Sequence, residues 1–257
     1  MLFDSHLHTR FSTDSEMEFA DLRATSPLEN CGIIITEHLD LNYPVPEKFV
    51  FPVDDYFTAY ESYRSNRLLL GIEIGLRSDC LEENRQVISH HPFDFVLGSI
   101  HVVNKHDLYY APYYEGRSKQ AAYQEYFQAM LDCVKVYDFI DSLGHIDYIA
   151  RYAPYPDPEV YYREFSEAID AVLISLAQQE VALEINTRRF AAQQVIDHLV
   201  PIYRRFQELG GKYVTLGSDA HRPEAVASHL ADAWELAQTC NLQAVYYQDR
   251  QRKIMNL

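Results

Sequence analysis

Two short motifs near opposite ends of the chain each place two metal-binding side chains two residues apart. Near the start, Asp4-Ser-His6-Leu-His8 offers two imidazoles, and near the end Ser-Asp219-Ala-His221 offers a carboxylate and an imidazole. Residues two apart on a β-strand point to the same face, so each pair can reach one ion. Histidine nitrogens and carboxylate oxygens are ligands of divalent metals in enzymes. The motifs therefore predict two parts of one metal centre, with Asp4 placed to orient an imidazole from behind.

Four further ligand candidates stand at or near the ends of other apolar runs. His38, His101 and His145 each follow such a run, and Glu73 is a carboxylate inside an otherwise apolar strand. A buried carboxylate is rarely left unpaired, so we expect Glu73 to contact a metal ion or, failing that, an arginine or lysine from elsewhere. Asp147 is placed to brace His145. Five histidines stand in helical or loop contexts and are expected to have no such role: His90, His91, His106, His198 and His229.

Short apolar runs alternate with helix-like segments along the whole chain. The expected strands are Met1–Asp4, Ile33–Thr36, Leu68–Ile74, Phe93–Ile100, Asp138–Leu143, Val181–Ile185 and Tyr213–Leu216. The expected helices are Asp54–Arg67, Ser118–Tyr137, Pro158–Gln179 and Ala192–Gly210. This alternation predicts parallel βαβ units, and no linker or change in composition divides the chain. We therefore expect a single α/β domain over residues 1–257, a barrel whose strands gather the ligands at their C-terminal ends.

Charge and composition limit the classes of partner. The formal net charge is −16 and no cluster of lysine and arginine is present, so we expect no nucleic-acid binding. No apolar run approaches the ~18 residues of a membrane span, and no secretory signal is recognisable, so we expect no membrane partner. The four cysteines stand far apart, which favours reduced thiols and a cytoplasmic location. Tyrosines crowd the stretch from Tyr109 to Tyr126, where we expect half-buried amphipathic packing; the alternative is that one or two of them line a pocket.

Taken together, the motifs resemble those of the polymerase and histidinol phosphatase (PHP) superfamily, with spacing similar to its histidinol-phosphatase branch. The resemblance is carried by Asp4-Ser-His6-Leu-His8, Thr36-Glu37-His38, Glu73, His101, Gly144-His145 and Gly217-Ser-Asp219-Ala-His221. It runs from residue 4 to about residue 222, and nothing diagnostic follows. The fold of this family is a distorted (β/α)7 TIM-like barrel, which agrees with the apolar runs counted above. The resemblance therefore implies a PHP-type metallophosphoesterase domain.

The resemblance also implies a centre of about three divalent ions, for which histidine with carboxylate suits Zn, Mn or Fe alike. The first ion would be held by His6, His8, Glu73 and Asp219, the second by Glu73, His101 and His145, and the third by Asp14, His38 and His221. Glu73 would thus bridge two ions. Asp14 enters only through the resemblance, since from the sequence alone it is an acid near a helix start.

The reaction that the resemblance implies is hydrolysis of L-histidinol phosphate to L-histidinol and phosphate, in histidine biosynthesis. A hydroxide bridging two ions would attack phosphorus, with Glu73 and Asp219 among the catalytic residues. Arg151 would bind the phosphate of this small substrate. The chain departs from the branch after Asn186-Thr187: a glycine is missing, and Arg188 and Arg189 stand in succession. Arg188 is the further candidate for binding substrate phosphate.

Alternative functions remain open from the sequence. The main alternative is another phosphoesterase of the same superfamily, acting on nucleotides or sugar phosphates, and a protein-tyrosine phosphatase is a further one. An amidohydrolase, a different class of enzyme, is a weaker alternative because such an enzyme usually carries a metal-bridging lysine in the role that Glu73 has here. A non-catalytic binding protein would tolerate the loss of ligands, and none is lost. The sequence leaves the oligomeric state open.

Overall fold

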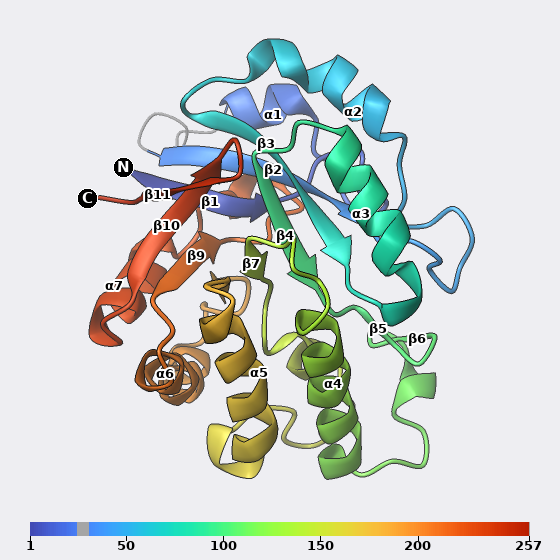
Figure 1. Cartoon of the computed structure of the whole chain (residues 1–257), viewed down its shortest axis with the longest axis vertical. Coiled ribbons are helices and arrows are strands. Elements are labelled where there is room, and N and C mark those ends of the chain that lie inside the picture. Colours follow the sequence, from blue (N-terminus) through green and yellow to red (C-terminus); the bar gives the residue numbers. More distant parts are fainter. Residues whose placement is uncertain (25–30, 257) are drawn as a thin grey trace.

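A sheet of parallel strands forms the centre of the molecule, which a computed structural model describes for residues 1–24 and 31–256 (Figure 1). Seven parallel strands follow one another in chain order: β1 (Leu2–Leu7), β2 (Cys31–Leu39), β3 (Leu68–Gly75), β4 (Phe95–Ser99), β7 (Ser142–Leu143), β8 (Ala182–Asn186) and β9 (Tyr213–Gly217). They are buried over nearly their whole lengths, as expected of apolar strands covered on both faces. Each matches one of the predicted runs, so the predicted α/β class is confirmed.

The sheet curves until the end of β1 lies against the residues that follow β9, which gives it the outline of a distorted barrel at the carboxyl ends of the strands, although β1 and β9 do not pair along their lengths. Leu7 forms a parallel bridge with Ala220. The amide of His8 donates to the carbonyl of Ala220 at 2.8 Å, and the amide of Asp219 donates to the carbonyl of His6 at 2.7 Å. These hydrogen bonds therefore involve predicted metal ligands, which places the first and last motifs side by side.

The opposite end of the barrel is covered by a C-terminal hairpin. Helix α7 (Leu230–Thr239) leads into β10 (Gln243–Gln248), which pairs parallel with β9 and antiparallel with β11 (Gln251–Ile254). The ring of Phe3 in β1 stacks on Tyr246 in β10, with centroids 3.8 Å apart. The last part of the chain thus packs against the first strand, and the two termini lie beside each other (Figure 1).

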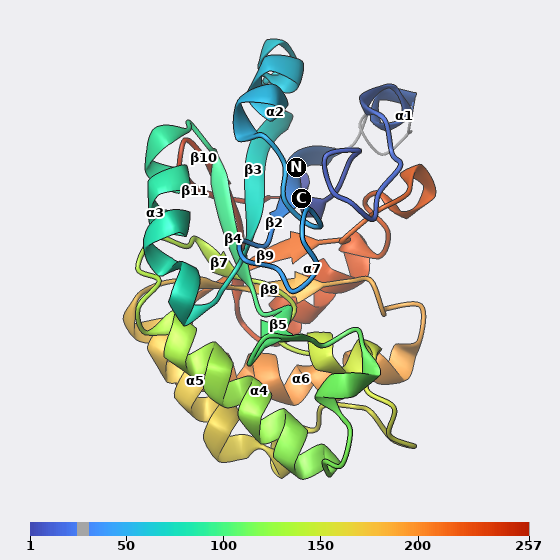
Figure 2. The same cartoon turned by 90° about the vertical axis from the view of Figure 1, so that its right-hand side faces the viewer.

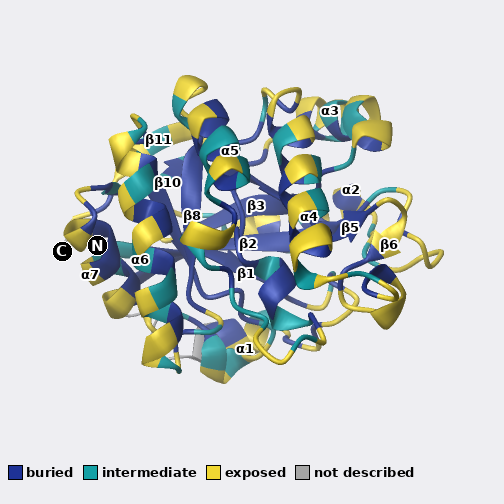
Figure 3. Ribbon diagram, turned by 90° about the horizontal axis from the view of Figure 1, so that it is seen from below, coloured by how far each residue is buried: buried dark blue, intermediate teal, exposed yellow. Residues whose placement is uncertain are grey.

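Helices surround the sheet and turn their exposed faces outward (Figure 3). Besides α7 they are α1 (Phe19–Ala24), α2 (Val53–Tyr60), α3 (Leu81–His90), α4 (Lys119–Val134), α5 (Ser166–Gln178) and α6 (Gln193–Glu208). In α6 the buried residues include Val195, Leu199, Ile202 and Phe206, a spacing that gives one apolar helix face. Helices α4, α5 and α6 follow one another along the same side of the sheet (Figure 2). Among the described residues, no helix is both long and apolar enough to cross a membrane.

The prediction of a helix over 158–179 is wrong in its first third. The helix begins only at Ser166, and the preceding segment is irregular apart from one 3-10 turn. Three prolines at alternate positions, Pro154, Pro156 and Pro158, precede it. Because each proline disfavours the helical conformation of the residue before it, this stretch is non-helical up to Asp157, but these prolines do not explain why residues 159–165 are irregular.

Candidate metal centre

The predicted ligands converge at the carboxyl ends of the strands. They stand in or after β1 (His6, His8, Asp14), β2 (His38), β3 (Glu73), β4 (His101), β7 (His145) and β9 (Asp219, His221). The β2–β3 register places His38 directly opposite Glu73. All of these side chains are buried except Asp14, which is exposed, and His221, which is half-buried. Parallel strands bring their carboxyl ends to one face, which explains why residues so far apart in sequence meet.

Four ligand atoms form a first group in the most buried part of the centre. Nε2 of His6 lies 3.0 Å from Nε2 of His8, and Oε2 of Glu73 lies 3.3 Å from the former and 3.5 Å from the latter. Oδ1 of Asp219 lies 3.7 and 3.4 Å from the same two nitrogens. Ligands bound tetrahedrally at about 2.0–2.1 Å stand about 3.3–3.4 Å apart, so this group fits one ion.

The other oxygen of Glu73 belongs to a second group. Oε1 of Glu73 lies 3.0 Å from Nε2 of His145 and 3.3 Å from Nε2 of His101. The two imidazole nitrogens are 3.4 Å apart. One carboxylate therefore offers each of its oxygens to a different set of histidines, as a ligand that bridges two ions must.

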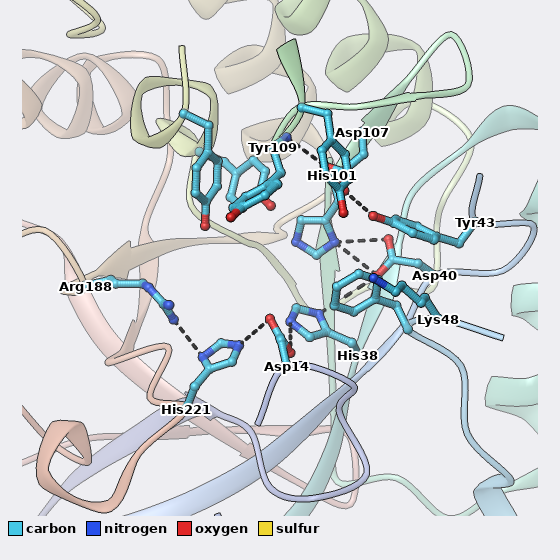
Figure 4. Close-up of a pocket in the computed structure, with 14 residues that line it drawn as sticks. Asp14, His38, Asp40, Tyr43, Lys48, His101, Asp107, Tyr109, Arg188 and His221 are labelled. Carbon is cyan, nitrogen blue, oxygen red and sulfur yellow. Dashed lines mark hydrogen bonds and ion pairs between the residues drawn. The ribbon is translucent and has the colours of Figure 1, made fainter. Parts of the chain in front are cut away.

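A third, more open group lies toward solvent (Figure 4). Nε2 of His221 is 3.0 Å from Oδ2 of Asp14, and Nε2 of His38 is 3.8 Å from Oδ1 of the same carboxylate. Nδ1 of His38 also lies 2.7 Å from Oε2 of Glu73, which joins this group to the first. The Asp14 side chain is 43% exposed, so this position is the most accessible of the three.

The charges in the centre favour cations. Burial alone would raise the pKa of Glu73, but His6, His38 and His101 hold it well below its usual range. Among the described residues, Oε2 of Glu73 and Nε2 of His221 are buried atoms that form no hydrogen bond of good geometry, although Nδ1 of His38 lies 2.7 Å from the former and Oδ2 of Asp14 lies 3.0 Å from the latter. Buried polar atoms of this kind are costly unless another group binds them, and a divalent ion would supply that partner. The donor set therefore fits metal ions.

The two aspartates predicted to brace imidazoles do not do so. Asp4 instead accepts a hydrogen bond from the amide of Ser218 at 2.8 Å and so holds the loop after β9. Asp147 pairs with Arg189, whose Nη1 donates to it at 2.9 Å. Nδ1 of His145 has no hydrogen-bond partner among the described residues. Asp4 does lie on the same strand as His6, but its carboxylate is bound by Ser218 in the loop after β9, and Asp147 lies in the turn after β7, where its carboxylate is bound by Arg189.

Other polar residues hold the histidine rings instead. Nδ1 of His101 lies 3.0 Å from Oδ1 of Asp40. Nδ1 of His8 lies 3.1 Å from the hydroxyl of Ser12, which donates to Glu37 at 2.6 Å. Contacts of this kind orient metal-binding imidazoles. The sequence offered a signal for Glu37 and Asp40, since both are acids at the end of an apolar strand.

Glu184 in β8 is the most important residue that the sequence interpretation missed. Its Oε1 lies 2.6 Å from Nδ1 of His6, and its Oε2 accepts a hydrogen bond from the amide of His145 at 2.7 Å. Glu184 lies between Leu183 and Ile185, so it carries the same signal as Glu73, a carboxylate inside an apolar strand. That signal was applied only to Glu73.

Two arginines border the centre in different ways. Arg151 is only 7% exposed, and it donates from Nη1 to Oδ2 of Asp219 at 2.6 Å and from Nη2 to Asn186 at 2.9 Å. Burial alone would raise the pKa of Asp219, but Arg151 holds it well below the usual range. Arg188 is 38% exposed and donates to the carbonyl of Asp219 at 2.6 Å, and its Nη1 lies 2.7 Å from Nδ1 of His221, which is also 2.9 Å from that carbonyl. Of the consecutive residues Arg188 and Arg189, Arg188 lines the cavity, whereas the side chain of Arg189 pairs with Asp147.

A cavity of about 340 Å³ opens above the second and third groups (Figure 4). Five tyrosines line it: Tyr43, Tyr109, Tyr110, Tyr148 and Tyr152. Asp107 also lines it, and accepts hydrogen bonds from the hydroxyl of Tyr43 and, at 2.7 Å, from the amide of Tyr109. Tyr109 and Tyr110 of the tyrosine-rich stretch therefore reach a pocket, which was the alternative, whereas Tyr113, Tyr114, Tyr123 and Tyr126 are buried by packing, which was the expectation. The histidines expected to have no role lie outside the possible metal-ligand groups of the described residues: His90, His91, His106, His198 and His229.

Comparison with known proteins agrees with this geometry. Residues 4–188 match the PHP domain family. The chain is 47% identical to a Clostridium acetobutylicum protein named "Probable histidinol-phosphatase", covering 98% of this chain and 99% of that protein. It is 34% identical to the histidinol-phosphatase of Lactococcus lactis over 85% of this chain and 83% of that protein. The crystal structure of histidinol phosphate phosphatase from L. lactis, complexed with zinc, L-histidinol and phosphate, superposes with a TM-score of 0.90 at 29% identity, covering 98% of each chain.

Proposed function

This chain belongs to the PHP domain family, and on that premise we propose that it is a phosphatase that hydrolyses L-histidinol phosphate to L-histidinol and phosphate. The observation that carries the proposal is the distribution of charge around the ligand cluster. Arginines border one side of the cluster, and the wall of the adjoining cavity consists mainly of carboxylates and aromatic rings, with one lysine, Lys48, among them. A substrate with an anionic phosphate at one end and a cationic amine at the other matches this arrangement.

We propose that about three divalent ions occupy the centre. The ligands would be His6, His8, Asp14, His38, Glu73, His101, His145, Asp219 and His221. Bound there, such ions would offset the charge of a phosphate group and activate water as a nucleophile. Zinc is the ion named for the L. lactis relative, although manganese and iron accept the same types of ligand.

The phosphate end of the substrate would lie between the centre and Arg188. The guanidinium of Arg188 is partly exposed to the cavity and already contacts His221 and the carbonyl of Asp219, so its remaining N–H groups can bind phosphate oxygens. Arg151 lies behind Asp219 and is nearly buried. We propose that it holds the Asp219 carboxylate in place and supports phosphate binding from that side.

The other end of the substrate would lie in the tyrosine-lined cavity. Asp107 is fixed by Tyr43 and by the amide of Tyr109, and can accept a hydrogen bond from an ammonium group. Burial raises the pKa of the Tyr43 hydroxyl, which therefore stays protonated as a donor. Aromatic faces such as that of Tyr148 also attract cations and stack on planar rings, which suits both the amine and the imidazole of histidinol.

The proposed reaction belongs to histidine biosynthesis, and we expect the enzyme in the cytoplasm. The four cysteines are buried and free, which fits a reducing compartment. The proposal is tested by measuring phosphate release from L-histidinol phosphate, a sugar phosphate, a nucleotide and p-nitrophenyl phosphate. We expect kcat/KM for L-histidinol phosphate to exceed that for p-nitrophenyl phosphate by at least ~100-fold, on the order of 3 kcal/mol of transition-state discrimination. A nucleotide or sugar phosphate as the best substrate would replace the proposal with the alternative in the same family.

A further inference from the structure

Glu184 occupies a position from which it controls one of the metal-binding histidines. We infer that Glu184 is a positioning residue that holds His6 in the tautomer able to bind a metal ion through Nε2. Its side chain is 1% exposed, and Oε1 lies 2.6 Å from Nδ1 of His6. The inference rests on the metal centre of the proposed function and is independent of the substrate.

The hydrogen bonds of Glu184 divide cleanly between its two oxygens. Oε2 accepts from the amide of His145 at 2.7 Å and from Nδ2 of Asn186 at 3.1 Å. Oε1 is left to face Nδ1 of His6. An ionised carboxylate only accepts hydrogen bonds, so the hydrogen between Oε1 and His6 must be on Nδ1. In the neutral imidazole, which is the form that binds a metal ion, the lone pair is then on Nε2, and Nε2 points at His8 and Glu73, where the first ion would bind.

The surrounding backbone leaves room for this carboxylate. A methyl group at Gly217 would lie 2.4 Å from Oε1 of Glu184 and 2.4 Å from Cβ of His6. At Gly144, a methyl group would lie 2.3 Å from Ser99 and 3.6 Å from Oε2 of Glu184. Both glycines stand at the ends of strands that neighbour β8. The contact between Glu184 and His6 is therefore a close-packed feature of the site that no side chain at position 217 would allow.

A glutamine at this position has the same shape but cannot satisfy the same partners. It offers one carbonyl oxygen and one NH2 group in place of two acceptors. The amide of His145 and the NH2 of Asn186 both require an acceptor, so the oxygen of the glutamine turns toward them. Its NH2 group then faces Nδ1 of His6 and requires a lone pair there. His6 would have to carry its hydrogen on Nε2, and that hydrogen competes with the ion.

The test compares Glu184→Gln with a matched control, Asp94→Asn. Asp94 is also 1% exposed and accepts hydrogen bonds from the amides of Leu70 and Asp249, each at 2.9 Å, but it stands at the amino end of β4, away from the centre. Each metal-free protein is titrated with Zn²⁺ against a chromophoric chelator, and the thermal midpoint of each metal-free protein is recorded. Co²⁺ is substituted in parallel, and its visible absorption reports the ligands of the ion.

We expect Glu184→Gln to weaken the binding of one zinc ion by about 10- to 100-fold and to change the Co²⁺ spectrum, as the loss of a residue that orients a ligand does. Asp94→Asn should lower the thermal midpoint while leaving zinc affinities within about twofold of wild type, because it touches no ligand. Wild-type zinc affinities and an unchanged Co²⁺ spectrum in Glu184→Gln, with only a lowered thermal midpoint, would show a merely structural role and overturn the inference.

If Glu184→Gln does not fold, the tautomer of His6 is tested on the zinc-loaded wild-type protein. Its histidine ¹⁵N spectrum, with His6 assigned by comparison with His6→Ala, should show His6 bound to zinc through Nε2 and carrying a hydrogen on Nδ1. Binding through Nδ1 would overturn the inference. A wild-type protein that binds no Zn²⁺ would overturn the proposed function and this inference together, whereas poor hydrolysis of L-histidinol phosphate would overturn only the former.

Discussion

The guanidinium of Arg151 donates a 2.6 Å hydrogen bond to Oδ2 of Asp219, whose other oxygen faces the histidines of the metal centre. Asp219 has a positive φ of 54°, a conformation that is unfavourable for residues other than glycine. The same residue donates its amide to the carbonyl of His6. Arg151 and the contact between Asp219 and β1 thus hold the carboxylate with one oxygen on the guanidinium and the other toward His6 and His8.

We predict that Arg151→Ala lowers both activity and stability. The variant loses the charge-assisted hydrogen bonds of the Arg151 guanidinium, each of which contributes roughly 1.5–3 kcal/mol. We therefore expect kcat/KM for L-histidinol phosphate to fall by at least ~10-fold. Because the pair is buried, the metal-free variant should also lose about 3–5 kcal/mol of unfolding free energy. Arg151→Lys retains the positive charge but lacks the planar guanidinium that forms two parallel hydrogen bonds, so it should recover only part of the activity and part of the stability. Steady-state kinetics and urea unfolding check this, and wild-type values for both in Arg151→Ala would contradict it.

Glu73 and Asp14 should differ in how many ions depend on them. Glu73 directs one oxygen to His6 and the other to His145, whereas Asp14 contacts only the third group. Glu73→Gln should therefore lose more metal per chain than Asp14→Asn, and should abolish measurable activity. Elemental analysis of the purified variants provides the comparison. Equal metal content in the two variants would rule out a bridging role for Glu73.

Asp107 should affect the choice of substrate more than the chemistry. Asp107→Asn removes a carboxylate that the proposal places against the ammonium group, so kcat/KM for L-histidinol phosphate should fall by roughly 10-fold or more. Hydrolysis of p-nitrophenyl phosphate, which has no ammonium group, should fall much less. A matched change at the exposed Glu208, Glu208→Gln, should affect neither substrate. An equal loss for both substrates in Asp107→Asn would argue against this placement.

Phe3→Ala should destabilise the fold because it breaks the contact between the first strand and the C-terminal hairpin. Phe3 is fully buried and stacks on Tyr246, so its truncation should cost about 3–5 kcal/mol of unfolding free energy. Ile174→Ala on the outer face of α5, where the side chain is 39% exposed, should cost no more than about 0.5 kcal/mol. Chemical denaturation of both variants tests whether the hairpin is part of the cooperative unit, and equal stabilities would show that it is not.

The strands and the ligand cluster could be predicted because their signals are local. A strand that is buried on both faces appears in the sequence as a continuous apolar run. A metal ligand appears as a histidine or carboxylate at the carboxyl end of such a run. The first strand was predicted over Met1–Asp4 but runs to Leu7 through polar residues that the buried centre accommodates. Helix α3 was not predicted because it is a short, largely polar segment in which only Asn84 and Ile88 are buried.

Glu184 and Asp40 carry a local signal, but which histidine each of them contacts could not be predicted because it depends on tertiary contacts. Glu184 reaches His6 across 178 positions of sequence, and Asp40 reaches His101 across 61. Asp107 is brought to the cavity by a short hairpin that follows β4. The C-terminal hairpin likewise carries no motif that indicates its role in the sequence. Its role as a structural support is indicated by the packing of Tyr246 on Phe3.

The central claim is that several bound ions at this centre support hydrolysis of L-histidinol phosphate. It is tested most directly by stripping the protein with a chelator and then adding Zn²⁺ back in measured steps while phosphate release is recorded. The stripped protein should be inactive, and activity should return as the metal content rises to about three ions per chain. Full activity in the stripped protein, or full activity with a single bound ion, would contradict the claim.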